Sequence, residues 1–452
     1  MNLLLAIQRR SRIMRELIWI GAGQAAVAMA GIVGVRLLTH AMDPQSYGEV
    51  ALGMTVATLV NQLIFGPLTN APARFYAPAV EAKRLGALIE ALQRIVRRSL
   101  GLITALALAA CLLFRTQLIR SLPMLLAALA FSGVAGCASI CDALQNAARH
   151  RAVVASHQGV SQWLRFLLAV LLLRLVAPSS WVAMVGYAIG TALVLPSQVW
   201  FLWRRIGILT ACEDAPPAVV VARTYKEILQ YVWPFCNWGI FTWLQVSSDR
   251  WALQAFRSTH EVGLYQSVYQ LGYYPVLMLS TVTMQLTTPI IFARAGDGRD
   301  PLRLQGALQL NAWIYYGILG ATALVAAGAM LWHDQVFHFF TAPVYWSAAT
   351  LLPAVVLSSG LFAAAQAATV SILCSKGSAP LLTPKIAVAL TGVALNAAGA
   401  YYRGGVGVVW AGALVSALYF TWILVIVLRL PSRFPAAYAT SRQLGSAKLT
   451  ET

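Results

Sequence analysis

Residues 152–203 read AVVASHQGVSQWLRFLLAVLLLRLVAPSSWVAMVGYAIGTALVLPSQVWFLW, and this stretch decides the fold class. It holds two apolar segments, 152–177 and 180–203, with only a Pro-Ser turn between them. Each is long enough to cross a bilayer as a helix, which takes about 20 residues. A single charge, Arg165, interrupts the middle of the first segment. The stretch therefore predicts two consecutive membrane-spanning helices.

The rest of the chain has the same apolar character. Of its 452 residues, 59% are apolar and 11% are charged, and the mean hydropathy is +0.70. A soluble globular domain is about 45–50% apolar and about 25% charged. This composition excludes an ordinary soluble enzyme, a disordered tail protein and a secreted disulfide scaffold. We expect an all-α polytopic membrane protein, and the length accommodates about twelve transmembrane helices with short loops.

Apolar segments of spanning length fall into two sets of six, separated by one long polar interval at 204–226. We therefore expect two six-helix bundles related by a parallel repeat. Residues 1–226 would form the first bundle with a cytoplasmic linker, and 227–452 the second with a short basic tail. The twelve segments are approximately 16–40, 48–72, 96–114, 120–145, 152–177, 180–203, 228–250, 262–293, 307–332, 345–374, 379–401 and 405–430.

The net charge of +18 comes from 33 Lys and Arg against 15 Asp and Glu. In a soluble protein this balance would indicate a nucleic-acid partner, whereas membrane proteins gather Lys and Arg on the cytoplasmic side. With the N-terminus inside, 25 of the 33 fall in cytoplasmic segments. We therefore expect both termini in the cytoplasm and no nucleic-acid partner. The first apolar run continues to Leu38, too long for a signal peptide, so we expect it to stay uncleaved.

The two halves contain similar stretches in the same order. Arg36 ends the first span of one half and Arg250 ends the first span of the other. A glycine follows each arginine at a similar distance, Gly48 in the first half and Gly263 in the second. Each following span ends near a proline and leads into an amphipathic stretch. The matching order indicates an internal duplication, which is common in transporters.

No catalytic motif is present in the sequence. It has no phosphate-binding loop, no dinucleotide fingerprint, no HExxH and no nucleophile elbow. None of the six cysteines falls in a predicted outer loop, so no disulfide framework is expected. We therefore predict that the protein is not an enzyme, and we expect neither a cofactor nor a metal centre.

Charged residues near or within the membrane carry the functional information, because burying a charge in lipid costs at least about 2.5–3.5 kcal/mol. Arg165 lies in mid-span, Arg36 and Arg250 end spans on the outer side, and Arg74 ends the second span. Arginine offers paired donors to phosphate and carboxylate groups. We expect these four residues to bind an anionic head group in a cavity.

Each of these assignments has a structural alternative. An arginine at the end of a span can snorkel to the interface or mark topology. For Arg165 the alternative is an ion pair with Asp142, and Asp249 with Arg250 can form a structural pair. Either carboxylate, Asp142 or Asp249, can instead couple transport to a proton or Na⁺ gradient.

Amide side chains recur along the spans, and they suit the hydroxyl groups of sugars. Any one of them can equally hold helices together through interhelical hydrogen bonds. The candidate glycan contacts are Gln62, Gln162, Asn237, Gln245 and Gln270.

These motifs resemble those of the Wzx-like oligosaccharide and polysaccharide flippases of the multidrug/oligosaccharidyl-lipid/polysaccharide exporter superfamily. The likeness in layout covers nearly the whole chain. The matching pieces are Arg36-Leu37-Leu38 with Tyr47-Gly48, the span from Gly66 to Arg74-Phe75, Asp249-Arg250 with Val262-Gly263-Leu264-Tyr265, and Pro289 to Arg294-Ala295-Gly296-Asp297-Gly298.

The resemblance implies two six-helix bundles around a central cationic cavity. It implies transfer of undecaprenyl-diphosphate-linked oligosaccharide across the bacterial cytoplasmic (inner) membrane, by alternating access, for exopolysaccharide, capsule or O-antigen synthesis. It extends to Arg36, Arg74 and Arg250, whereas Arg165 is assigned from its burial alone. The implied partners are the lipid-linked substrate, membrane lipid, and polysaccharide polymerase or export proteins.

Two other functions stay open. A cation-coupled multidrug or metabolite antiporter of the same superfamily usually needs embedded carboxylates, and this chain has few. A membrane glycan polymerase or ligase commonly needs a large outer loop, whereas the longest outer stretches here lie around 250–262 and 333–345. The second stretch contains His333, Asp334 and His338, a cluster more typical of a solvated loop than of a metal site.

Overall fold

The computed structural model describes residues 2–113, 122–210, 216–296, 300–377 and 379–430, and all regular structure within these ranges is helical. Two short π-helical segments, η1 (Asn61–Phe65) and η2 (Tyr269–Tyr273), and two 3-10 segments, η3 (Pro343–Leu351) and η4 (Ala379–Leu381), join longer helices. The α-helices are α1 (Asn2–Ala41), α2 (Pro44–Val60), α3 (Gly66–Glu81), α4 (Leu85–Leu113), α5 (Leu122–Ala147), α6 (Arg151–Leu175), α7 (Ser180–Thr210), α8 (Ala218–Phe256), α9 (Thr259–Val268), α10 (Tyr274–Ala295), α11 (Pro301–Phe340), α12 (Leu352–Lys376) and α13 (Leu382–Leu428).

The described helices account for the twelve predicted membrane crossings. Nine helical stretches in the described ranges are long and apolar enough to span a membrane, among them α2–η1–α3 and α9–η2–α10, each as one continuous stretch. α6 and α8, with 25 and 39 residues, are also long enough but more polar. α13, with 47 residues, is two helices joined at Gly404, whose φ of 58° favours glycine. The predicted fold class is therefore confirmed.

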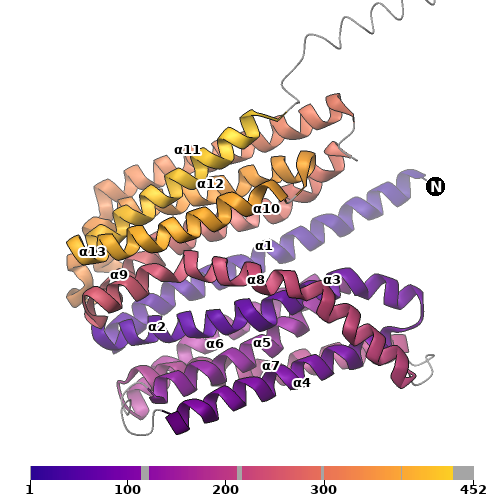
Figure 1. Cartoon of the computed structure of the whole chain (residues 1–452), viewed down its shortest axis with the longest axis horizontal. Coiled ribbons are helices and arrows are strands. Elements are labelled where there is room, and N and C mark those ends of the chain that lie inside the picture. Colours follow the sequence, from indigo (N-terminus) through magenta and orange to yellow (C-terminus); the bar gives the residue numbers. More distant parts are fainter. Residues whose placement is uncertain (1, 114–121, 211–215, 297–299, 378, 431–452) are drawn as a thin grey trace, which may run out of the picture.

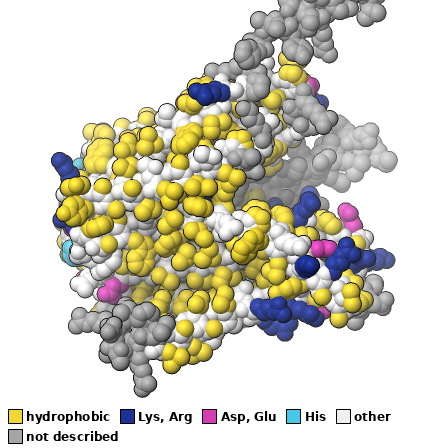
Figure 2. Space-filling view, in the orientation of Figure 1, with side chains coloured by type: hydrophobic (Ala, Val, Ile, Leu, Met, Phe, Trp, Pro, Cys, Tyr) yellow, Lys and Arg dark blue, Asp and Glu magenta, His cyan; other side chains and the backbone are white. Residues whose placement is uncertain are grey.

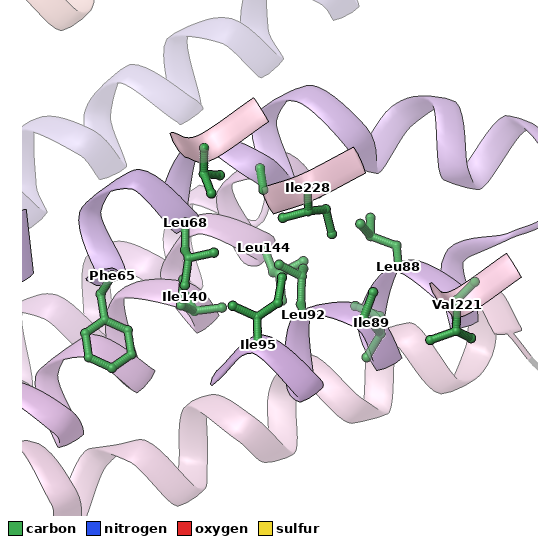
Figure 3. Packing of buried hydrophobic residues seen from close by; sticks show 14 of the residues in the cluster. Phe65, Leu68, Leu88, Ile89, Leu92, Ile95, Ile140, Leu144, Val221 and Ile228 are labelled. Carbon is green, nitrogen blue, oxygen red and sulfur yellow. The ribbon is translucent and has the colours of Figure 1, made fainter. Parts of the chain in front are cut away.

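The helices form two bundles that lie side by side (Figure 1). α2–α7 make up one, and α9–α13 make up the other, while α1 packs mainly against α6. α8 contacts both bundles, because its second half packs against α13 and its first half packs against α4. Val221 and Ile228 of α8 join the same buried cluster as Leu88 and Leu92 of α4 (Figure 3). The division of the chain at residue 226 stays a prediction.

The outer surface is suited to lipid. Large apolar side chains are exposed on both bundles, for example Leu171, Leu193, Leu324 and Leu414. Figure 2 shows a large group of Lys and Arg at the end of the molecule where α3, α4 and α8 meet. This is the end that the charge count predicts to be cytoplasmic. The orientation of the termini stays a prediction.

At the opposite end, the two bundles meet closely along what we call the outer seam, formed by residues 44–48 and 259–263. A Cβ atom on Gly48 of α2 would collide with the carbonyl oxygen of Thr259, and one on Gly263 of α9 would collide with that of Pro44. Glycine at both positions lets the two backbones approach directly. The molecule is therefore closed at the end predicted to be extracytoplasmic.

Candidate functional site: a cationic cavity between the bundles

A cavity of about 260 Å³ lies between the two bundles. Its lining comes from α1, α2, α5, α6 and α7 on one side and from α8, α9, η2 and α10 on the other. Arg165 of α6 and Arg250 of α8 both line it. The structure thus brings together two of the four arginines predicted to bind an anion. In transporters built from repeats, the interface between the repeats is where substrates bind.

Arg165 carries a positive charge into this cavity without a carboxylate of the described residues in direct contact with it. Its Nε donates a hydrogen bond to Oγ1 of Thr191 (2.8 Å) and its Nη1 donates to Oε1 of Gln162 (3.2 Å). The guanidinium carbon lies 5.1 Å from the ring centre of Phe131. Among the described residues, no carboxylate forms an ion pair with Arg165, and Nη2 has no acceptor. The alternative of an ion pair with Asp142 is therefore not realised.

Arg250, in contrast, brings its own counter-ion. Its Nη1 lies 3.0 Å from Oδ1 of Asp249, and its Nε donates to Oε1 of Gln266 (2.8 Å). The guanidinium stacks on Tyr269, with 4.1 Å between its carbon and the ring centre. Tyr265 donates to Oδ2 of Asp249 (2.6 Å). Arg250 is only 6% exposed, so this pair adds directed donors to the cavity wall and almost no net charge.

A second cavity of about 350 Å³ adjoins the first and shares Gln162 and Arg165 with it. Asp142 of α5 lines this second cavity. Its Oδ2 accepts a hydrogen bond from Nε2 of Gln158 (2.9 Å), and its Oδ1 accepts one from Nε2 of Gln198 (3.0 Å). Asp142 is thus held by neutral amides and not by an arginine.

Two buried amide oxygens near Asp142 have no hydrogen-bond donor in the described part of the chain. They are Oε1 of Gln145 and Oε1 of Gln198, in side chains that are 1% and 2% exposed. Nε2 of Gln145 donates to the carbonyl oxygen of Gln198 (3.1 Å), which holds the two amides together. Burying a polar atom without a partner costs about 1–3 kcal/mol. A bound cation or a hydrogen-bond donor at these oxygens would remove that cost.

Arg36 and Arg74 lie elsewhere. Arg36 is exposed, donates through Nη1 to the carbonyl oxygen of Phe339 (2.6 Å), and lies 4.8 Å above the ring of the same residue. It therefore bridges the two bundles near the outer seam and does not line the central cavity. Arg74 is exposed on α3, also outside that lining. Their assignment to anion binding stays a prediction.

The five candidate glycan contacts are spread over the molecule. Gln162 and Gln270 line the central cavity. Gln245 lines a smaller cavity of about 60 Å³ inside the second bundle, next to Asp249. Gln62 packs its backbone against Gly239, and the exposed Asn237 lies outside the central lining. The role of all five amides stays a prediction.

Sequence reasoning missed the two π-helical segments. η1 and η2 occur at corresponding places in the two halves, each shortly before a proline, Pro67 or Pro275. Tyr269 and Gln270 of η2 line the central cavity, and Asn61 of η1 lines the second. Single-turn π-helices are frequent at functional sites. The repeated proline was the available signal, but prolines also occur in static helices.

Solved structures with the same fold are flippases and transporters. The lipid II flippase MurJ in an inward closed conformation matches with a TM-score of 0.70 and 12% identity, over 96% of this chain and 93% of that one. A multidrug resistance MATE family transporter of the MOP superfamily matches in its inward-facing conformation with a TM-score of 0.64 and 16% identity, over 91% and 96%. An outward-facing MATE structure gives a TM-score of 0.57 at 16% identity, over 93% and 96%.

Fold and cavity together define a class: an all-helical, multi-pass membrane protein with a cationic cavity between two bundles, built on the fold that these flippase and transporter structures share. The family model described as polysaccharide biosynthesis protein matches residues 13–293. The chain belongs to this family, which confirms the resemblance found in the sequence. No curated protein matches the chain.

Proposed function

We propose that this protein is a flippase that moves undecaprenyl-diphosphate-linked oligosaccharide from the cytoplasmic to the periplasmic leaflet, for exopolysaccharide, capsule or O-antigen synthesis. The observation that carries the proposal is the meeting of Arg165 and Arg250 in one cavity between the bundles. A diphosphate needs both positive charge and directed donors. Arg165 supplies the charge, and Arg250 supplies donors fixed by Asp249 and Gln266.

The neighbouring residues suit the sugar part of the same substrate. Gln162 and Gln270 offer amide groups to the cavity, and Tyr269 and Tyr274 offer aromatic rings. The polyprenyl tail stays in the surrounding lipid, and rocking of one bundle against the other exposes the cavity to either side in turn. Polymerase or export proteins would receive the flipped product.

For ion coupling, we propose Asp142 in preference to Asp249. Both oxygens of Asp249 are already held, by Arg250 and by Tyr265. Asp142 has no basic group in direct contact among the described residues, faces the second cavity, and lies near the two unpartnered amide oxygens. It can therefore take up a proton or a Na⁺ ion from the cavity while the substrate is absent.

The test follows lipid-linked intermediates in a deletion strain with leaflet-specific labelling. We expect them to stay in the cytoplasmic leaflet, and wild-type protein to restore export. Arg165→Gln should lower export roughly 10- to 100-fold at equal protein level, because a hydrogen bond to a charged group contributes about 1.5–3 kcal/mol. Arg174→Gln, at an exposed position on the same helix, is the matched control and should restore export fully.

Two outcomes would contradict the proposal. Intermediates that reach the periplasmic leaflet but stay unpolymerised would indicate a polymerase or ligase. Unchanged polysaccharide together with altered drug sensitivity would indicate a multidrug or metabolite antiporter.

A further inference from the structure

A third cavity opens beside the turn between α5 and α6, at the end predicted to be cytoplasmic. Its volume is about 640 Å³, and Asn146, Arg149 and Arg151 are part of its lining. It shares Asp142 and Gln158 with the second cavity, which in turn shares its own residues with the central one. The three cavities therefore follow one another from this turn to the space between the bundles, and we call this row of cavities the passage.

Arg151 lines the outer part of this passage, and one edge of its guanidinium has no hydrogen-bond partner among the described residues. Its Nη1 donates to Oδ1 of Asn146 (2.6 Å), which fixes the plane of the guanidinium. Its Nε is buried without a partner, and Nη2 has no acceptor within the described ranges. Nε and Nη2 form the edge of arginine that binds two oxygens of a phosphate at once.

Arg149 lies beside it in a conformation that arginine rarely adopts. Its φ is 61°, in the left-handed region, and the turn is closed by the backbone N–H of His150, which donates to the carbonyl oxygen of Gln145 (2.9 Å). This conformation costs an L-residue other than glycine or asparagine roughly 1–2 kcal/mol. Burial and the nearby Arg205 lower the pKa of His150, so at neutral pH the positive charge of the turn comes from the arginines.

We propose that Arg149 and Arg151 form a loading site that binds a diphosphate ester before it reaches the central cavity. This inference rests on the proposed function and adds an earlier binding site for the same substrate. The outer lining holds two arginines, and its single carboxylate, Asp142, lies at the inner end where the passage continues. A diphosphate bound at the turn is thus close to two cations, and it must pass Asp142 to reach Arg165.

Another turn of the same kind provides a matched control. Lys83, between α3 and α4, also adopts a left-handed conformation, with a φ of 52°, and Arg84 follows it. Neither residue is part of the lining of the three cavities. Two double variants therefore remove the same charge. One is Arg149→Gly/Arg151→Gln, and the other is Lys83→Gly/Arg84→Gln. In both pairs the glycine also relieves backbone strain, so a folding defect is not expected.

The binding test uses full-length protein in phosphatidylcholine nanodiscs and farnesyl diphosphate as the probe, measured by calorimetry. Both double variants are made in an Arg165→Gln background, which removes the arginine proposed to bind the diphosphate in the central cavity. We expect Arg149→Gly/Arg151→Gln to weaken binding at least tenfold and the Lys83/Arg84 control to leave it unchanged. Equal affinities in the two variants would overturn the loading site. Inorganic pyrophosphate that binds as tightly as farnesyl diphosphate would also overturn it, because the site would then recognise a free diphosphate.

A transport assay separates this inference from the proposed function. In proteoliposomes with a fluorescent polyprenyl-diphosphate-linked sugar, loss of the loading site should raise KM about tenfold and leave kcat unchanged. Arg165→Gln should lower kcat. If Arg149→Gly/Arg151→Gln has the KM of the wild-type protein while Arg165→Gln has a lower kcat, the loading site is wrong. The proposed flippase function would not be affected by that result. Absence of transport by the wild-type protein would overturn the flippase itself.

Discussion

At the scale of single residues, the two cavity arginines differ in how their charge is balanced. Arg250 is held by Asp249 and Gln266, whereas Arg165 is held by the hydroxyl group of Thr191 and an amide. The sequence identified Arg165 because a lone charge in mid-span is costly. It did not reveal Gln266 or Thr191, because hydrogen-bond partners far apart in sequence leave no local pattern. It grouped Arg36 with the others because Arg36 also lies at the end of a span and within a matching motif.

Removing Asp249 should destabilise the protein. Asp249→Asn leaves Arg250 as a buried charge without a counter-ion, and breaking a buried pair in this way costs about 3–5 kcal/mol. We expect a thermal unfolding temperature several degrees lower in detergent, monitored by tryptophan fluorescence. Asp334→Asn, at an exposed carboxylate, is the control and should leave the unfolding temperature unchanged. An Asp249→Asn protein as stable as wild type would show that the pair does not hold α8 in place.

At the scale of helices, apolar segment lengths predicted most of the architecture. The break expected between 401 and 405 is confirmed by the kink at Gly404. The polar interval at 204–226 was predicted too long, because α7 continues to Thr210 and α8 already begins at Ala218. The first turns of α8 are stabilised by burial of Val221 against the first bundle, a tertiary contact that local composition does not reveal.

The outer seam gives a prediction at this scale. A methyl group at Gly48 or Gly263 would force the two backbones apart, so Gly48→Ala and Gly263→Ala should favour an outward-open form. Tyr345, whose hydroxyl donates to the carbonyl oxygen of Met42 (3.0 Å), is buried at the same end. In a Tyr345→Cys background, labelling by a membrane-impermeant thiol reagent should rise several-fold.

The control for the seam is Gly317→Ala, at a glycine on α11 with open space around its Cβ position. It should leave the labelling rate as it is. Equal labelling in all three alanine variants would mean that the seam does not hold the molecule closed.

At the scale of the whole molecule, one closed end and a passage towards the other define a single state of an alternating-access cycle. The sequence predicted two bundles and a cationic cavity, but it could not show which charges share that cavity. Which charges share the cavity depends on how the two bundles meet. In this state Arg36 bridges the bundles, whereas Arg165 and Arg250 line the cavity from opposite sides.

The coupling assignment is tested on the complete transport cycle. In proteoliposomes, an imposed inward-acidic or Na⁺ gradient should accelerate transport by the wild-type protein several-fold. Asp142→Asn should transport at the rate without a gradient under both conditions, because its amide neither takes up a proton nor carries charge to bind Na⁺. Asp334→Asn should respond as the wild type does. A full gradient response in Asp142→Asn would place coupling elsewhere.

The adjacent positions of Asp249 and Arg250 also matter for how the chain is inserted during synthesis. A lone arginine opposes partition of a helix into lipid, by about 2.5–3.5 kcal/mol at mid-span. α8 contains its own neutralising neighbour, with 3.0 Å between the charged groups, which lowers the net charge that enters the bilayer with this helix. α6 has no such neighbour for Arg165, and the hydroxyl group that holds this arginine belongs to α7. We therefore expect insertion of α6 to depend more strongly on α7, the next helix to be synthesised, than insertion of α8 depends on any partner.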